Sequence, residues 1–318
     1  MPALQTLAFA DAERRNPVGI GGVPSVRIID EAREIASSGH RSDDERFGHA
    51  AIMVHTVWTA ERIALAYFAY LGIVCWLRPI GVARRVRVSL VAVVGCLAVW
   101  RIASAPLALR LWAPLAYILV GYYASAYLFI APSRALEQWL LAWDRRLLND
   151  PSTRFARWPR PVLAALEIIY MGCFILIGAG FMVMVVNGYA GCADEYWTLV
   201  VGAELGSFAP LAFFQTRPPW ALERKPALAD PFVHELANRM IQHFTIHVNT
   251  FPSGHVAGSL AVALAVMAVM PWMGLSLLVL AAAIAVATVV GRYHYVADGI
   301  AGAALTLAIW AALRAFAR

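Results

Sequence analysis

Charged side chains are scarce in this sequence, which excludes an ordinary soluble domain. Only 14% of the 318 residues are charged and 61% are hydrophobic, whereas soluble domains are about one quarter charged and half apolar. Long runs of like charge are also missing, and the net charge of +6 is spread over the connections between apolar runs. This pattern favours contact with membrane lipids and gives no sign of nucleic-acid binding.

Cysteine is rare as well, and its spacing excludes a disulfide or zinc framework. No C-x-x-C pair occurs, so we expect ordinary thiols that are mostly buried in apolar runs. The histidines at 234, 243 and 247 lack the HExxH spacing of a zinc helix, and we therefore expect no metal and no cofactor. The cysteines in question are Cys75, Cys96, Cys173 and Cys192.

A signal-peptide pattern is absent from the first part of the chain. Residues 1–55 are polar and mixed in charge, without a basic start followed by an apolar core and a small-residue cleavage site. A short amphipathic helix over residues 28–36 and an irregular tail remain open alternatives for this segment.

Long apolar runs make up most of the remaining chain. Eight of them approach the roughly 20 residues that a helix needs to cross a bilayer. We therefore expect an all-α fold, a polytopic membrane helical bundle with about eight transmembrane helices. The runs cover residues 60–77, 87–104, 111–131, 162–187, 195–214, 255–270, 274–290 and 295–313.

Two polar segments between these runs are expected at the membrane surface. Residues 132–161 are rich in arginine and indicate a solvated connection held by lipid headgroups, with attraction of an anionic lipid as a secondary role. In the segment 215–249, Asp230-Pro231 is typical of a helix start, and apolar residues then recur every fourth position. We expect an interfacial helix there, lying across the mouth of a site between Arg217 and His255.

Two polar motifs bracket the runs 255–270 and 274–290. Pro252-Ser253-Gly254-His255 precedes the first run, and Arg292-Tyr293-His294 with Asp298 follows the second. If the two runs form an antiparallel hairpin, both motifs reach the same membrane surface. Ionisable residues in such a setting indicate a functional site.

The residue types in these motifs suit phosphate chemistry. Ser253 is a natural helix cap, and Gly254 allows an anion to approach the amides of the first turn closely. His294 and Asp298 are four apart and share a helix face, so the carboxylate can hold one ring nitrogen while the other attacks phosphorus. Arg292 offers a planar fork to phosphate oxygens, and His255 a proton to the leaving oxygen.

Each of these residues, taken alone, also fits a structural role. A single histidine at a helix end is more often structural, and Asp298 alone would be interpreted as a cap, but the combination favours a catalytic site. Glu167 and Tyr170 are polar within an apolar run. They either line a lipid cavity or bond to neighbours on their own helix.

The PSGH motif followed by an arginine and His-x-x-x-Asp resembles the type 2 phosphatidic acid phosphatase (PAP2) superfamily. The resemblance covers roughly the last half of the chain, from about Leu163. Ala287 and Thr288 stand where the family has Ser-Arg, so Arg292 is expected to replace that arginine. The sequence Gly-Arg-Tyr-His-Tyr at 291–295 resembles a branch that includes inositol-phosphoceramide-synthase-like proteins.

The first family motif is only partly present. Arg217-Pro218 matches it, but Pro210 stands where the family has lysine. The resemblance therefore implies a phosphate-binding role for Arg217, in company with Ser253 and Gly254.

The resemblance also implies an architecture and an activity. The last six runs would form a six-helix core, with additional helices and the first core helix in 56–131 and the remainder in 132–318. The implied activity is metal-independent hydrolysis of a lipid phosphate or diphosphate through a phosphohistidine intermediate. Two alternatives remain open: a phosphotransferase that uses an alcohol acceptor, and an inactive lipid-binding or transport protein.

The implied location is a bacterial inner membrane with the site facing away from the cytoplasm. The distribution of arginines over the connections favours the opposite orientation by the positive-inside rule. Arginines that bind lipid phosphate would weaken that rule here, so we keep the family orientation as the expectation.

Overall fold

The described part of this computed structural model comprises residues 57–223, 239, 243, 245–246 and 248–316. Within it the chain forms ten α-helices, and the only β pairing is an isolated bridge between Thr216 and Asn249. The helix considered at 28–36 lies outside the described residues, as does nearly all of the interfacial helix expected after Asp230.

Each of the eight predicted runs forms a helix, and the all-α membrane bundle is confirmed. Five of these helices, α3, α5, α8, α12 and α13, are long and apolar enough to cross a membrane. The other three are less typical of membrane spans. Helix α4 is continuous but carries arginines near both ends, and α9 and α11 have only 16 residues each. The eight helices are α3 (Thr59–Leu77), α4 (Val82–Ile102), α5 (Leu107–Ala126), α8 (Arg160–Val186), α9 (Ala193–Phe208), α11 (Gly254–Val269), α12 (Pro271–Val290) and α13 (Val296–Phe316).

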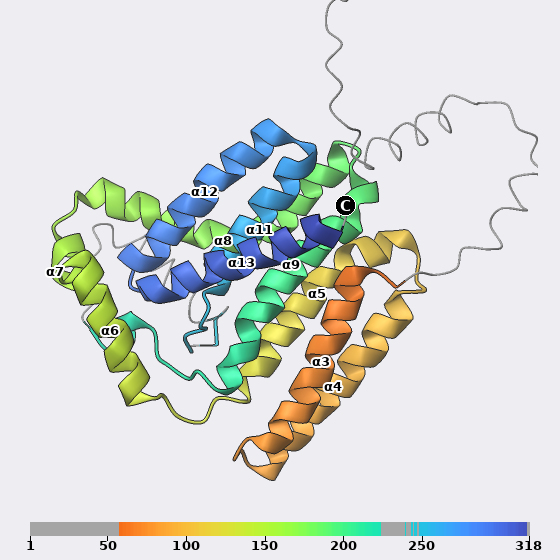
Figure 1. Cartoon of the computed structure of the whole chain (residues 1–318), viewed down its shortest axis with the longest axis horizontal. Helices are drawn as coiled ribbons and strands as arrows, with labels where there is room; N and C mark the ends of the chain where they lie inside the picture. Colours follow the sequence, from red (N-terminus) through yellow and green to blue (C-terminus); the bar gives the residue numbers. More distant parts are fainter. Residues whose placement is uncertain (1–56, 224–238, 240–242, 244, 247, 317–318) are drawn as a thin grey trace, which may run out of the picture. The chain divides into compact units, whose positions relative to one another are not determined.

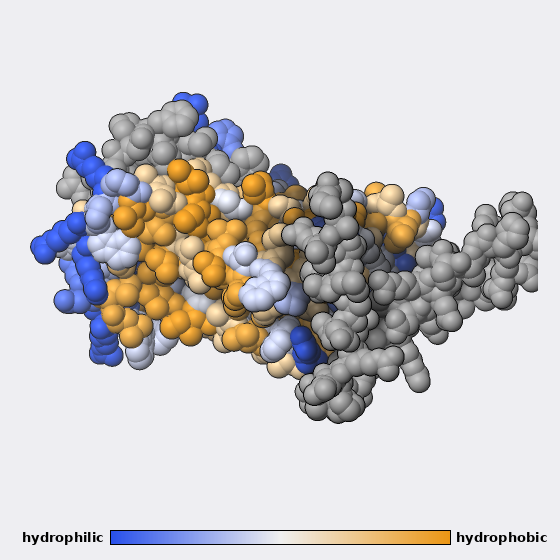
Figure 2. Space-filling model, turned by 90° about the horizontal axis from the view of Figure 1, so that it is seen from above, coloured by the Kyte–Doolittle hydropathy of each residue, from blue (hydrophilic) through white to orange (hydrophobic). Residues whose placement is uncertain are grey.

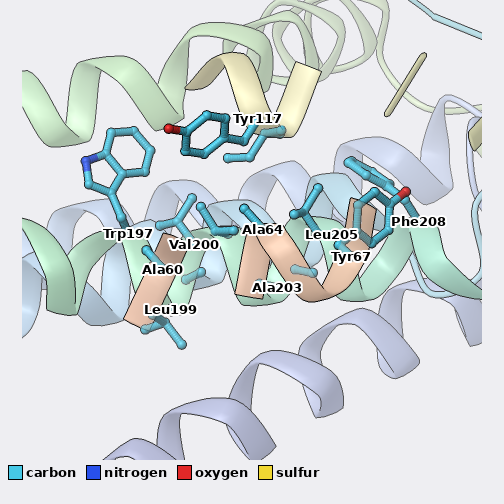
Figure 3. Packing of buried hydrophobic residues seen from close by; sticks show 14 of the residues in the cluster. Ala60, Ala64, Tyr67, Tyr117, Trp197, Leu199, Val200, Ala203, Leu205 and Phe208 are labelled. Atoms are coloured by element: carbon cyan, nitrogen blue, oxygen red, sulfur yellow. The ribbon is translucent and has the colours of Figure 1, made fainter. Parts of the chain in front are cut away.

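Helix α9 lies at the centre of the bundle (Figure 1) and contacts α3, α5, α11 and α13. Thirteen of its 16 residues are buried, as expected for a helix without a polar face. Figure 3 shows its side chains packed against residues of α3 and α5. The indole of Trp197 donates a hydrogen bond to the carbonyl of Leu111 on α5 at 2.9 Å, which ties the two helices together.

Segment 132–161 differs from the solvated connection that we expected. It folds into α6 (Arg134–Leu148) and α7 (Pro151–Ala156), and the hydroxyl of Ser133 caps α6 by accepting from the amide of Leu136. The buried face of α6 holds Glu137, Leu140 and Asp144, whereas its arginines are exposed. The segment is therefore amphipathic, and its acidic side chains point into the protein.

The outer surface of the bundle is strongly apolar. Figure 2 shows a broad hydrophobic band, with hydrophilic atoms gathered at the end where α6 and α7 lie. Large side chains on this surface, such as Leu90, Ile175 and Val279, are 62%, 70% and 66% exposed. An apolar surface of this extent is unusual in water and suits contact with lipid chains.

Helices α11 and α12 form the predicted hairpin, with Pro271 at the first position of α12. Helix α13 fixes the start of α11, because the amide of Ser253 donates to the carbonyl of Asp298 at 2.9 Å and the hydroxyl of Thr306 donates to that of Ala257 at 2.9 Å. A Cβ atom at Gly302 would collide with the Ser253 carbonyl. This glycine therefore allows the beginnings of α11 and α13 to lie side by side.

Candidate active site

His255 and His294 face each other at the end of the bundle, as the hairpin predicts. Their ring centroids are 5.4 Å apart with an interplanar angle of 79°. Both line a cavity of about 150 Å³, together with Gly254, Tyr170 and Glu204. The lining combines these polar groups with apolar side chains such as Phe174 and Ile177, so it suits a ligand with both polar and apolar parts.

Asp298 holds one nitrogen of His294. Its Oδ2 atom lies 3.2 Å from Nδ1 of His294 and also accepts a hydrogen bond from the Tyr295 amide at 3.0 Å. The side chain of Asp298 is fully buried. His294 lies in the turn before α13 rather than on the helix, so the contact is made across that turn. With Nδ1 engaged, Nε2 is the nitrogen left for a substrate.

The turn that carries His294 is built on the end of α12. The carbonyl of Thr288 accepts the amides of both Tyr293 and His294, at 2.9 and 3.1 Å. Thr288 is one of the two positions where the family pattern has Ser-Arg. Thr288 supports the turn through its backbone carbonyl, a role that the identity of its side chain did not predict.

Side chains from one face of α8 contact the His255 ring. The hydroxyl of Tyr170 lies 3.3 Å from Nε2 and the thiol of Cys173 lies 3.6 Å from Nδ1. The Tyr170 ring also stacks on Tyr293 with centroids 4.0 Å apart, and the Tyr293 hydroxyl donates to Glu167 at 3.1 Å. Tyr170 thus lines the cavity, one of its two expected roles, whereas the contact of Cys173 with His255 was not anticipated.

Ser253 and Gly254 occupy the start of α11. The hydroxyl of Ser253 accepts from the amide of Val256 at 3.4 Å, which is the predicted capping contact. Gly254 is the first residue of the helix and lines the cavity. The first-turn amides of a helix lack carbonyl partners in the preceding turn, so this end is suited to an anion.

Arg292 is fully buried between two carboxylates. Its amino groups donate to Asp144 and to Glu223, each at 2.7 Å, and Asp144 also accepts the Val296 amide at 2.9 Å. Arg292 has a φ of 58°, in the left-handed region that few non-glycine residues adopt. Its phosphate-binding role stays a prediction, because both amino groups already have carboxylate partners.

Glu223 is held in its charged form by this network. Burial acts to raise the pKa of Glu223, but hydrogen bonds from Ser152, Arg292 and Arg145 outweigh it and keep the pKa below its ordinary value. A charged Glu223 is the expected partner of a buried guanidinium.

Arg217 forms a second pair with α6. Its guanidinium contacts both carboxylate oxygens of Glu137, at 3.0 and 2.9 Å, and its amide donates to the same side chain at 2.9 Å. Burial acts to raise the pKa of Glu137, and these bonds from Arg217 more than offset it, so the pKa is lowered. The Arg217 side chain is 42% exposed and open to a ligand at the surface, but it is not among the residues that line the cavity of the two histidines.

Acidic residues of α6 are the part of the site that sequence reasoning missed. Glu137 and Asp144 lie seven apart on the buried face of this helix, and this spacing was the available signal. Among the described residues, no cluster of three potential metal ligands occurs.

We predict that Arg292→Gln lowers the free energy of unfolding by about 3–5 kcal/mol, because Asp144 and Glu223 would stay buried without their shared cation. Arg145→Gln is the matched control: its side chain is 60% exposed and also bonds Glu223, so the loss should stay below about 1 kcal/mol. Unfolding in detergent micelles measures both. An Arg292→Gln protein with unchanged stability but weaker substrate binding would instead support direct phosphate binding.

Comparison with known families agrees with this geometry. The model of the PAP2 superfamily matches residues 138–312, more than half of the chain. The match extends from α6 to α13, so it includes Asp144, both histidines and Asp298, and begins earlier than the motifs alone suggested. No curated protein and no solved structure gave a significant match, and the likeness to the inositol-phosphoceramide-synthase-like branch stays a prediction. The chain belongs to the PAP2 superfamily.

Proposed function

We propose that this protein hydrolyses a lipid phosphate or diphosphate through a phosphohistidine formed on His294. The observation that carries the proposal is the pair of histidines lining one cavity, with Nδ1 of His294 held by Asp298. Membership of the PAP2 superfamily supports phosphoryl chemistry in a membrane protein. The substrate and the intermediate are part of the proposal.

In the first step, Nε2 of neutral His294 attacks phosphorus, and the bond between phosphorus and the leaving oxygen breaks. His255 donates a proton to that oxygen. Asp298 stabilises the positive charge that develops on the His294 ring and keeps the ring oriented. In the second step, water attacks phosphorus, its proton passes to His255, and the P–N bond breaks with its electron pair returning to His294.

The phosphate oxygens need hydrogen-bond donors during both steps. The start of α11 at Gly254 and His255 supplies amides and the positive end of a helix dipole. Arg217 is the arginine better placed to add a charge, because its exposed guanidinium can exchange Glu137 for phosphate. Arg292 would act indirectly, by holding the turn that carries His294.

The second candidate is a phosphotransferase, in which an alcohol takes the place of water in the second step. A specific observation favours it: the cavity contains the carboxylate of Glu204, which hydrolysis does not require. An inactive lipid-binding or transport protein is the third possibility, and it predicts no turnover at all.

Phosphate release tests the proposal directly. Purified protein should release phosphate from phosphatidic acid or a prenyl diphosphate in the presence of EDTA, because none of the proposed steps uses a metal. His294→Ala should reduce this release by at least about a thousandfold, as expected for loss of a nucleophile. Absence of release from every lipid phosphate, by protein that still binds the lipid, would support the inactive alternative.

The role of His255 predicts a dependence on the leaving group. His255→Ala should slow cleavage of an alkyl phosphate by about 10²–10⁴-fold, the usual contribution of a general acid. Cleavage of nitrophenyl phosphate should slow much less, because nitrophenolate leaves without a proton. Equal losses on both substrates, measured as initial rates, would show that His255 is not the proton donor in the first step.

We further propose that the site faces away from the cytoplasm of a bacterial cell, in keeping with the family resemblance. Thr153, which is exposed on α7, allows a test. A Thr153→Cys protein should react with an impermeant thiol reagent added to intact cells. Reaction only after the cells are opened would place the site on the cytoplasmic side.

A further inference from the structure

Glu204 places a carboxylate in the catalytic cavity. It lies near the end of α9, is 7% exposed, and lines the same space as His255 and His294. No described residue donates a hydrogen bond to this carboxyl group, and the Ser207 hydroxyl donates to the backbone carbonyl of Glu204 instead. Because Glu204 lines the cavity beside the two histidines, a ligand bound there can supply the donor.

Helix α11 is shaped to receive this carboxylate. Gly254 and Gly258 lie one turn apart and flank His255 along the helix. A Cβ atom at Gly258 would overlap Oε1 of Glu204, and one at Gly254 would lie 3.2 Å from Oε2. Each glycine inside a helix costs about 1 kcal/mol relative to alanine. The two glycines therefore leave space for the carboxyl group beside the turn that carries His255.

The hydrogen-bonding groups of the site decide what Glu204 can bind. Its carboxyl oxygens are acceptors, so they suit a hydrogen-bond donor next to the phosphate. The guanidinium groups of Arg217 and Arg292 are paired with other carboxylates and do not supply that donor. A hydroxyl group is the neutral donor that also belongs to the chemistry, since an alcohol can accept the phosphoryl group.

We propose that Glu204 marks an acceptor subsite for a small polyol. The carboxylate accepts a hydrogen bond from one hydroxyl, and the neighbouring hydroxyl attacks the phosphorus carried by His294. A P–O bond forms, the P–N bond breaks with its electron pair returning to the imidazole, and the hydroxyl proton passes to His255. This inference rests on the proposed phosphohistidine chemistry and names the acceptor that the second step prefers.

The apolar side of the cavity is consistent with this arrangement. Ile118, Leu119 and Phe208 line it and offer no partner to a hydroxyl. Polar groups for the phosphate and the acceptor therefore share the cavity with an apolar wall. Glu204 is a specificity-determining residue in this scheme, because it positions the acceptor without exchanging a proton.

Partitioning of the phosphoryl group tests the subsite. Nitrophenyl phosphate serves as the donor, glycerol or propan-1-ol as the acceptor, and phosphorus NMR measures the ratio of transfer to hydrolysis. Wild-type protein should transfer to glycerol at least about fivefold better than to propan-1-ol, the factor expected for one net hydrogen bond. Glu204→Ala should abolish this preference, and the partition ratio, not the rate of nitrophenol release, is the readout.

Controls separate the subsite from a general loss of structure. The partition ratio is independent of the amount of active protein, so partial unfolding cannot mimic the result. Glu204→Gln keeps the side-chain size and should reduce the preference in the same direction. Glu195→Ala, an exposed carboxylate in the first turn of the same helix, should leave the preference unchanged.

Several outcomes would overturn the subsite. Wild-type protein that hydrolyses but shows no preference for glycerol, or a preference that survives in Glu204→Ala, contradicts it and leaves the hydrolytic proposal intact. A Glu204-dependent preference for ethanolamine over glycerol replaces the polyol with an amino alcohol. Nitrophenol release that persists in His294→Ala overturns the phosphohistidine chemistry and the subsite with it.

Discussion

Arg292, Asp144 and Glu223 form a buried ion-pair network that joins α6 to the turn carrying His294. A guanidinium taken out of water needs well-placed carboxylates, and here it has one on each amino group. Asp144 also accepts the amide at the start of α13, so the same network sets the position of the helix that bears Asp298. The geometry of the histidine pair therefore depends on charges that lie outside the cavity.

Close helix approach is the second requirement of the site. Glycines at 254, 258 and 302 let α9 and α13 lie against the start of α11, where His255 is held by Tyr170 and Cys173 of α8. Four helices thus meet within one turn of the reacting groups. Such packing gives a closely packed site, and the apolar belt outside it (Figure 2) remains available to lipid chains.

Local patterns in the sequence were sufficient to predict the apolar helices, the hairpin and the pairing of His294 with Asp298. The ion pairs escaped prediction because their partners are far apart: Asp144 is 148 residues from Arg292, and Glu223 is 69 residues from it. Arginines dominate the composition of segment 132–161 and therefore predict a solvated connection, but the face that carries Glu137 and Asp144 is buried. Glu204 was not predicted as a site residue, because only the folded structure brings α9 against Gly258 of α11.

The central claim is that His294 carries the phosphoryl group and His255 moves the proton. Rapid quenching of the protein with radiolabelled substrate, followed by mass spectrometry of the labelled peptide, tests it most directly. We expect an acid-labile, base-stable phosphate on His294 in wild-type protein and no label in His294→Ala. A label that persists in His294→Ala and disappears only in His255→Ala would reverse the two roles and contradict the assignment.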